Sequence, residues 1–239
     1  MSLFVNTTHR SNSTELMDDF SLEGELLRDT LDKLGKINKW LGGNVVTLNG
    51  VQKLLNDLPK ERTYTIIDLG CGHGDILRQM ARFGRKNNYN FKLIGVDANQ
   101  DAVDYATDLS NDFPELTFKN IDIFSREFEE LDFDIAITTL FLHHFKDQEI
   151  ITLLKLLTEN ARVGLVINDL HRSKIAYGLF KLLSLTISND MIKKDGLTSI
   201  LRAFKRKELE KISKQLNLKS QIRWKWAFRY QWIIKTQWQ

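Results

Sequence analysis

Residues 64–75, with the sequence YTIIDLGCGHGD, constrain the fold of this 239-residue chain more than any other stretch. An apolar, β-branched run ends at Asp68, and glycines then occupy every second position, at Gly70, Gly72 and Gly74. Glycine reaches backbone dihedrals closed to other residues, and its missing Cβ lets a ligand lie against the main chain. The pattern predicts a strand, a tight turn and a helix start, with a ligand at the turn.

The position of the acid distinguishes this turn from a dinucleotide site. A dinucleotide fingerprint reads G-x-G-x-x-G and holds a pyrophosphate over a helix N-terminus, whereas this turn reads G-x-G-x-G. Asp68 stands two residues before the first glycine, where a carboxylate repels phosphate and suits a cation. A glycine-rich turn without a ligand is the alternative.

The stretch resembles the first motif of class I S-adenosylmethionine (SAM)-dependent methyltransferases, a strand followed by Asp or Glu and x-G-x-G-x-G. Asp68, Gly70, Gly72 and Gly74 match that motif, and the resemblance extends over about residues 60–239. It implies SAM as the cofactor and S-adenosylhomocysteine (SAH) as its product. It also implies that Asp68, Gly70 and Gly72 hold the methionine half of SAM.

Two further acids follow predicted strands and fit the same resemblance. A buried strand ends at Asp97, and the carboxyl ends of strands in a doubly wound sheet face one cleft. The resemblance assigns the ribose hydroxyls to Asp97, and the adenine amino group and ring to Asp122 and Ile123. Ala98 and Thr139 complete the expected cofactor contacts. As alternatives, Asp97 caps the following helix and Asp122 is a turn residue.

Three histidines stand where loops leave predicted strands, and each is a candidate catalytic base. His143 and His144 lie in LHHF after the fourth strand, and His171 follows the fifth. An imidazole titrates near neutral pH and can take the proton of a hydroxyl as the methyl group arrives. In the alternative interpretation these rings only pack or form hydrogen bonds. Arg172 either binds a substrate carboxylate or phosphate, or is solvated.

The loop after the fourth strand also excludes some classes of methyl acceptor. Methyltransferases that act on exocyclic amines of bases carry (N/D)-P-P-(Y/F) here, and cytosine C5 enzymes need a Pro-Cys nucleophile. Neither motif is present, because the chain has only Pro59, Pro114 and one cysteine, Cys71. A single cysteine also excludes a multi-cysteine zinc site, and no metal site is expected. LHHF instead resembles the loop of small-molecule methyltransferases, including quinone-type ones.

The order of elements predicts an α/β fold, a Rossmann-like three-layer sandwich with a seven-stranded, mainly parallel sheet and an antiparallel last strand. Residues 1–59 contain two amphipathic helices and are expected to form an N-terminal helical cap or lid of the same domain. The methyltransferase domain is expected over residues 60–239. The apolar segment 175–187 predicts a helix that is buried or lines a pocket, and residues 188–204 are interpreted as a polar loop.

The charge of the chain is uneven. The net charge is +3, but residues 202–239 hold eleven Lys and Arg against two acids. Aromatic residues occupy every even position from Trp224 to Trp232, which predicts strands with one buried face. The alternative is a basic aromatic surface that contacts nucleic acid or anionic lipid.

Together these features favour transfer of the SAM methyl group to a small, partly apolar acceptor, at a hydroxyl oxygen in preference to carbon or nitrogen. The expected partner is a small molecule rather than nucleic acid. The alternatives are an RNA or protein methyltransferase that uses the basic C-terminal region, and a non-catalytic protein with the SAM-binding fold. No run of about 18 apolar residues and no signal-like N-terminus is present, which predicts a cytoplasmic protein without an integral membrane segment.

Overall fold

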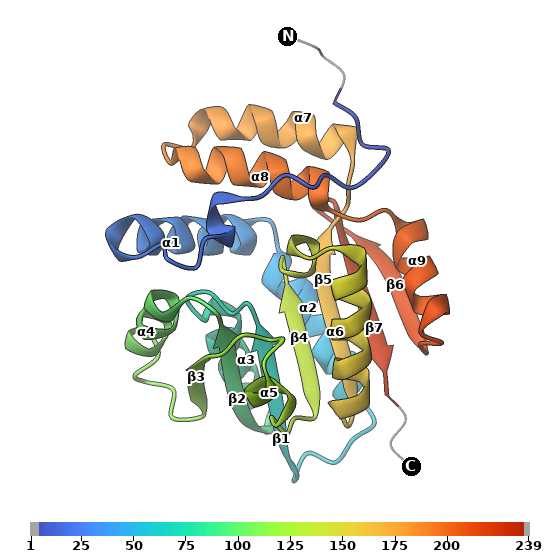
Figure 1. Cartoon of the computed structure of the whole chain (residues 1–239). Coiled ribbons are helices and arrows are strands. Elements are labelled where there is room, and N and C mark those ends of the chain that lie inside the picture. The colour runs from blue at the N-terminus through green and yellow to red at the C-terminus, as the bar shows by residue number, and fades with distance from the viewer. Residues whose placement is uncertain (1–4, 237–239) are drawn as a thin grey trace.

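A seven-stranded sheet in the order β3-β2-β1-β4-β5-β7-β6 forms the centre of the computed structural model, which describes residues 5–236 (Figure 1). Strand β7 runs antiparallel to β5 and β6, and the other neighbouring pairs are parallel. The predicted fold class is confirmed. The strands are β1 (Thr63–Leu69), β2 (Asn90–Asp97), β3 (Leu116–Asn120), β4 (Ile135–Thr139), β5 (Gly164–Leu170), β6 (Ser220–Lys225) and β7 (Arg229–Lys235).

Helices cover both faces of the sheet, because the central strands bury side chains on each side. In β1, for example, Ile66 packs toward α2 and α3, whereas Ile67 packs toward α6 and α9. The α-helices are α1 (Gly24–Trp40), α2 (Gly43–Leu55), α3 (Asp75–Asn87), α4 (Gln100–Asp108), α5 (Arg126–Glu129), α6 (Asp147–Asn160), α7 (Lys174–Leu183), α8 (Asp190–Arg202) and α9 (Arg206–Gln215). Short 3₁₀ turns are η1 (Leu16–Asp18), η2 (Leu142–His144) and η3 (Ser184–Thr186).

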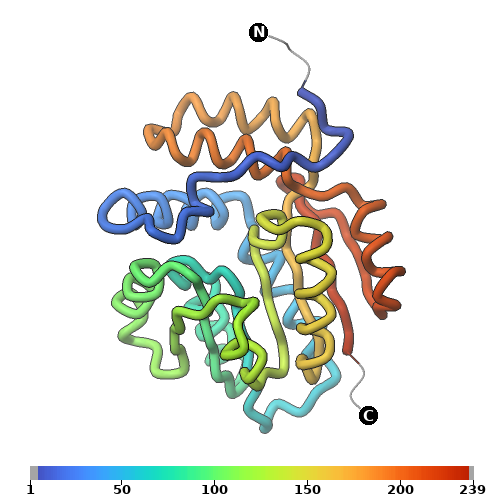
Figure 2. Tube along the Cα trace, in the orientation of Figure 1, coloured from blue at the N-terminus to red at the C-terminus, as the bar shows by residue number. Residues whose placement is uncertain are grey.

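A cap lies over the carboxyl ends of the parallel strands. Figure 1 shows α1, α7 and α8 stacked above that edge of the sheet, whereas α2 belongs to a covering layer. Residues 5–20, which we call the N-terminal strap, cross α8 and lead to α1 (Figure 2). The cap therefore combines N-terminal residues with a segment from the second half of the chain.

The prediction of a polar loop over residues 188–204 was wrong, because α8 occupies most of it. Asn189 caps the helix by accepting a hydrogen bond from Ile192 N. Gly196 lies within this helix, and a Cβ there would lie 2.2 Å from the Phe180 ring. The glycine lets α7 and α8 pack closely.

The aromatic C-terminal segment is divided between the core and the surface. Tyr230 and Trp232 of β7 are buried, as predicted. Trp224 and Trp226 are 50% and 73% exposed, because β6 is an edge strand and Trp226 lies in the following turn. The prediction of one continuous buried face is therefore correct only for β7. None of the helices between residues 5 and 236 is long and apolar enough to cross a membrane.

Candidate active site

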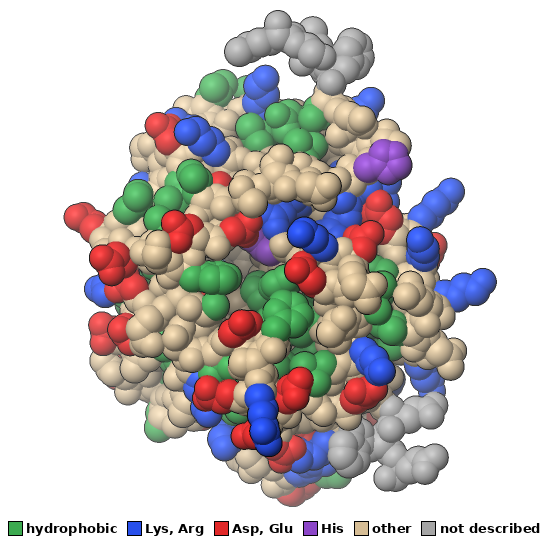
Figure 3. All heavy atoms as spheres, in the orientation of Figure 1, with side chains coloured by type: hydrophobic (Ala, Val, Ile, Leu, Met, Phe, Trp, Pro, Cys, Tyr) green, Lys and Arg blue, Asp and Glu red, His purple; other side chains and the backbone are tan. Residues whose placement is uncertain are grey.

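A cavity of about 1170 Å³ lies between the cap and the carboxyl ends of the strands. Figure 3 shows charged side chains gathered around a hollow on this face, with hydrophobic side chains beside it. Eight of the predicted site residues line the cavity: Asp68, Gly70, Gly72, Asp97, Thr139, His143, His144 and His171. The fold thus brings together residues that are up to 103 positions apart in the sequence.

The glycine turn has the backbone geometry that its sequence predicts. Gly70, Gly72 and Gly74 have φ angles of +66°, +50° and +75°, a region that favours glycine. Gly72 N donates a hydrogen bond to Asp97 Oδ2 at 2.9 Å, which ties the turn to the end of β2. A Cβ on Gly70 would lie 2.1 Å from the Phe141 ring.

Acidic side chains surround this turn. Asp68 is 3% exposed, and its carboxylate has no hydrogen-bond partner within residues 5–236. Burial, and then the charges of Asp75 and Asp97, raise the pKa of Asp68 well above its ordinary value. Burial also raises the pKa of Asp97, against the effect of backbone hydrogen bonds from Asn99 and Gly72. An unpartnered carboxylate in an acidic cavity suits a cationic ligand.

Three of the predicted cofactor residues do not line the cavity. Asp122 is exposed, and its Oδ1 accepts a hydrogen bond from Phe124 N at 2.9 Å, as in a turn. Ile123 is buried in the hydrophobic core, and Ala98 is half-buried beside Asp97. Thr139 does line the cavity, and its Oγ1 lies 2.8 Å from Thr47 Oγ1.

The loop after β4 carries backbone strain. Leu140 has a φ of +56°, which is uncommon for a residue with a branched side chain, and its N donates to Asn168 O at 2.8 Å. Such outliers gather at functional sites. Leu140 lines the cavity, between Thr139 and Phe141.

A family model described as a methyltransferase domain matches residues 60–222. The chain belongs to this methyltransferase family. The predicted resemblance is confirmed, and membership of the family implies SAM as the cofactor. The glycine turn and the unpartnered Asp68 fit a ligand that carries an ammonium and a sulfonium group.

Solved methyltransferase structures share the fold at low sequence identity. Plantazolicin methyltransferase BpumL in complex with SAH is 16% identical, with a TM-score of 0.64 over 88% of this chain and 89% of that one. An O-methyltransferase family protein from Burkholderia thailandensis is 16% identical, with a TM-score of 0.64 over 93% of this chain and 63% of that one. Magnesium protoporphyrin IX methyltransferase from Synechocystis PCC 6803 with bound SAH is 14% identical, with a TM-score of 0.55 over 92% and 93%. A search of curated proteins finds no match.

Two of the three histidines predicted as catalytic bases are fixed by carboxylates. His143 Nδ1 lies 2.7 Å from Asp169 Oδ1, and His144 Nδ1 lies 2.5 Å from Asp18 Oδ1. His143 is 2% exposed. Although burial opposes the shift, the hydrogen bonds of Asp18 with His144 and Arg202 hold its pKa below its ordinary value.

His171 has a different environment. Its ring lines the cavity beside Phe228 and Tyr230, with centroid distances of 6.4 and 5.1 Å. Its Nδ1 is buried and makes no hydrogen bond in the described part of the chain. Burial, with the nearby positive charges of Lys205 and Arg172, lowers the pKa of His171. The imidazole is therefore neutral at neutral pH.

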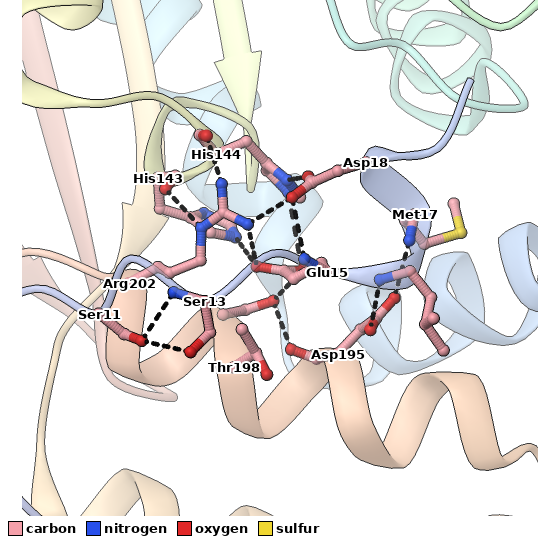
Figure 4. Close-up of polar contacts among 12 residues, drawn as sticks. Ser11, Ser13, Glu15, Met17, Asp18, His143, His144, Asp195, Thr198 and Arg202 are labelled. Atoms are coloured by element: carbon pink, nitrogen blue, oxygen red, sulfur yellow. Dashed lines mark hydrogen bonds and ion pairs between the residues drawn. The ribbon is translucent and has the colours of Figure 1, made fainter.

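Sequence reasoning missed Glu15, Asp18 and Arg202, which complete the polar cluster around the histidine pair (Figure 4). Glu15 is 6% exposed, and its Oε2 accepts a hydrogen bond from Ser199 Oγ at 2.7 Å. Burial raises the pKa of Glu15 to about 7. Arg202 Nη1 donates to Asp18 Oδ2 at 2.6 Å. The strap shows no periodic pattern in the sequence, so no local signal marks these acids.

Arg172 holds the strap instead of binding a substrate. Its side chain is buried, outside the cavity lining, and its guanidinium donates to Thr7 O and Thr8 O at 3.1 and 3.2 Å and to the Glu208 carboxylate. The predictions of a ligand contact and of a solvated side chain were both wrong. Arg172 contacts residues more than 30 positions away in the sequence, and a local sequence pattern does not reveal such contacts.

Proposed function

We propose that this chain transfers the methyl group of SAM to a small, partly apolar acceptor at a hydroxyl oxygen. One observation carries the proposal: the acid-lined glycine turn and an apolar wall belong to the same cavity. Leu179, Phe180 and Leu183 of α7 contribute to that wall, with Ile192 and Ile200 of α8. A volume of about 1170 Å³ exceeds the roughly 300–1,000 Å³ of a typical single-ligand pocket. The cavity therefore has room for SAM and an acceptor.

We assign the binding of SAM in this cavity to four residues. Gly70 and Gly72 let a ligand approach the backbone, and Asp68 supplies a buried negative charge. Asp97 accepts hydrogen bonds from Gly72 N and Asn99 N, and a carboxylate has acceptor sites left for two ribose hydroxyls. Bound SAM supplies an electrophilic methyl group on a sulfonium. The protein contributes alignment and the exclusion of water.

Among the three predicted bases, we assign to His171 the removal of the proton from the acceptor hydroxyl, through its Nε2 atom. The lowered pKa keeps this imidazole neutral, and no carboxylate engages its ring in the described part of the chain. The Nε2 atoms of His143 and His144 instead point toward Glu15. A base is needed only where the acceptor is a hydroxyl that must lose a proton.

The test is calorimetry with SAM and SAH, followed by a screen of hydroxylated aromatics with NMR of the methylated products. We expect binding of both cofactor forms and O-methylated products. Absence of cofactor binding would support the non-catalytic alternative. Products methylated at carbon or nitrogen would refute the assignment to oxygen.

An RNA acceptor is the second candidate, and one observation favours it. Exposed Trp224 and Trp226 alternate with Arg223 and Lys225 on the edge strand β6 and its turn, and stacking aromatics among basic residues can bind single-stranded RNA. Binding to RNA that weakens steeply with salt would support this candidate. Activity on small phenols that salt does not change would oppose it.

A further inference from the structure

Glu15 of the strap and the two histidines after β4 direct three potential ligand atoms toward one point. His143 Nε2 lies 3.7 Å from Glu15 Oε1, and His144 Nε2 lies 3.9 Å from Glu15 Oε2. One ligand atom from each residue can be chosen so that all lie within 4.8 Å of one another. Figure 4 shows the strap carboxylate facing both rings. All three residues also line the cavity.

The outer hydrogen bonds fix the tautomers of both rings. Asp169 and Asp18 contact the Nδ1 atoms of His143 and His144 at 2.7 and 2.5 Å, and an ionised carboxylate only accepts hydrogen bonds. Each Nδ1 therefore carries a hydrogen. In a neutral ring this leaves a lone pair on Nε2, directed at Glu15.

No hydrogen bond joins Glu15 to the Nε2 atom of either ring in the described part of the chain. Glu15 Oε1 and His143 Nε2 are buried and have no hydrogen-bond partner in the range 5–236. Their separation of 3.7 Å is too long for a direct hydrogen bond. Arg202 Nη1 lies 3.6 Å from Glu15 Oε1, which is also too long, because this guanidinium is already bound to Asp18.

The charges around the cluster also favour a bound cation. The carboxylates of Glu15, Asp18 and Asp169 contact the two rings, and Arg202 is the guanidinium that contacts this group of acids. Three carboxylates therefore surround the two rings, and this arrangement suits a cation between the three inner ligands.

We infer that Glu15, His143 and His144 bind a divalent first-row transition-metal ion. Imidazole nitrogens with one carboxylate suit zinc, iron or manganese, whereas calcium and magnesium prefer oxygen ligands throughout. Tetrahedral ligand atoms about 2.1 Å from a metal lie about 3.4 Å apart, so the three ligand atoms, which lie within 4.8 Å of one another, need to move closer together around the ion. Carboxylates that orient metal-bound histidines through Nδ1 are a recurrent feature of such sites.

The ion ties the strap to the loop after β4. Three protein ligands leave a coordination position open, as in catalytic zinc sites. Because the ligands line the cavity, we assign that position to the acceptor oxygen, a step that rests on the proposed function. The binding of the ion itself does not depend on methyl transfer.

The test uses the full chain after treatment with EDTA, titrated with Zn²⁺ by calorimetry and with Co²⁺ by visible absorption. We expect one equivalent of each ion and a Co²⁺ spectrum typical of nitrogen and oxygen ligands. Glu15→Gln and His144→Ala each weaken binding by about tenfold or more. His9→Ala is the matched control, because His9 is an exposed histidine of the same strap, and this variant retains the affinity of the wild type.

A second readout follows the strap by hydrogen exchange. Zn²⁺ slows exchange in residues 5–20 of the wild type and of His9→Ala, but not in Glu15→Gln. Circular dichroism establishes that each variant is folded, and SAH binding is measured separately, so loss of the metal is distinguished from loss of the proposed function. Zn²⁺ binding that is absent in the folded wild type, or unchanged in both ligand variants, would overturn the inference.

Discussion

Asp68 holds a carboxylate at the end of β1 in a position that costs the cofactor-free protein stability. Burial and two neighbouring acids raise its pKa, so its charged form is disfavoured in the folded state. Asp68→Asn keeps the shape and removes the charge. We expect this variant to raise the free energy of unfolding of the cofactor-free protein at neutral pH by about 1–3 kcal/mol and to weaken SAM binding.

The pH dependence of stability tests this prediction for Asp68. A folded-state pKa above the unfolded value means that wild-type stability is greatest below the unfolded pKa and falls as pH rises toward the folded pKa. Melting temperatures of wild type and Asp68→Asn should therefore diverge as the pH rises above about 4, the unfolded-state pKa of an aspartate. Asp122→Asn, at an exposed position, is the control. Parallel melting curves for Asp68→Asn and wild type would contradict the prediction.

Asp97 and Asp122 offer a direct comparison of two predicted cofactor contacts. We expect Asp97→Ala to weaken SAH binding by about 1–3 kcal/mol, because charge-assisted hydrogen bonds are lost and Gly72 N loses its acceptor. Asp122 lies outside the cavity lining and bonds within its own turn, so we expect Asp122→Ala to have a smaller effect. Calorimetry with SAH measures both. Equal losses would place Asp122 at the cofactor after all.

His171 gives a prediction about the pH profile. Its pKa lies below the ordinary value of 6.5, and protonation blocks a base, so kcat/KM should fall on the acid side with a midpoint below pH 6.5. We expect His171→Gln to lose that limb and to reduce kcat by roughly 10²–10⁴-fold. Initial rates over a pH series provide the measurement. An unchanged acid limb in His171→Gln would assign the base elsewhere.

At the scale of single elements, the turn between β1 and α3 depends on glycine for two separable reasons. Gly70 combines a positive φ with a Cβ position 2.1 Å from Phe141, whereas Gly42 has a φ of +72° and open space around it. We expect Gly42→Ala to cost about 1–2 kcal/mol from backbone strain alone. Gly70→Ala should cost about 1–3 kcal/mol more from overpacking, and should also reduce SAM binding. Urea unfolding compares the two, and equal costs would exclude the steric contribution.

The elements that sequence predicts well are those with a local cause. Strand β1, the glycine turn and α3 are encoded within residues 63–87, and the apolar pattern of β7 places Tyr230 and Trp232 in the core. The cap depends instead on pairs far apart in the chain. Ser199 contacts Glu15 across 184 positions, and no pattern near either residue signals it. Helix α8 was missed for a similar reason, since its glycine is explained only by the neighbouring helix.

For the molecule as a whole, the strap joins the cap to the loop after β4 at the cavity. Arg10 donates to the carbonyls of His143, Phe145 and Arg202, so one side chain joins the strap to the loop after β4 and to the end of α8. Asp195 of α8 accepts hydrogen bonds from the backbone of η1. Strap residues line the cavity along with the glycine turn. We therefore expect the exchange of a bound cofactor to require these contacts to break.

Deletion of residues 1–20 tests whether release of the cofactor depends on the strap. We expect SAH to dissociate about tenfold faster or more, because a lid that must open slows ligand release. Stopped-flow displacement measures the rate. Arg172→Met should also speed the dissociation of SAH, because it removes the hydrogen bonds to Thr7 and Thr8. Arg206→Met is the control, since the exposed side chain of Arg206 pairs with Glu210 of the same helix. If the deletion leaves the rate unchanged while Asp97→Ala still weakens affinity, the cofactor leaves by a route that the strap does not cover.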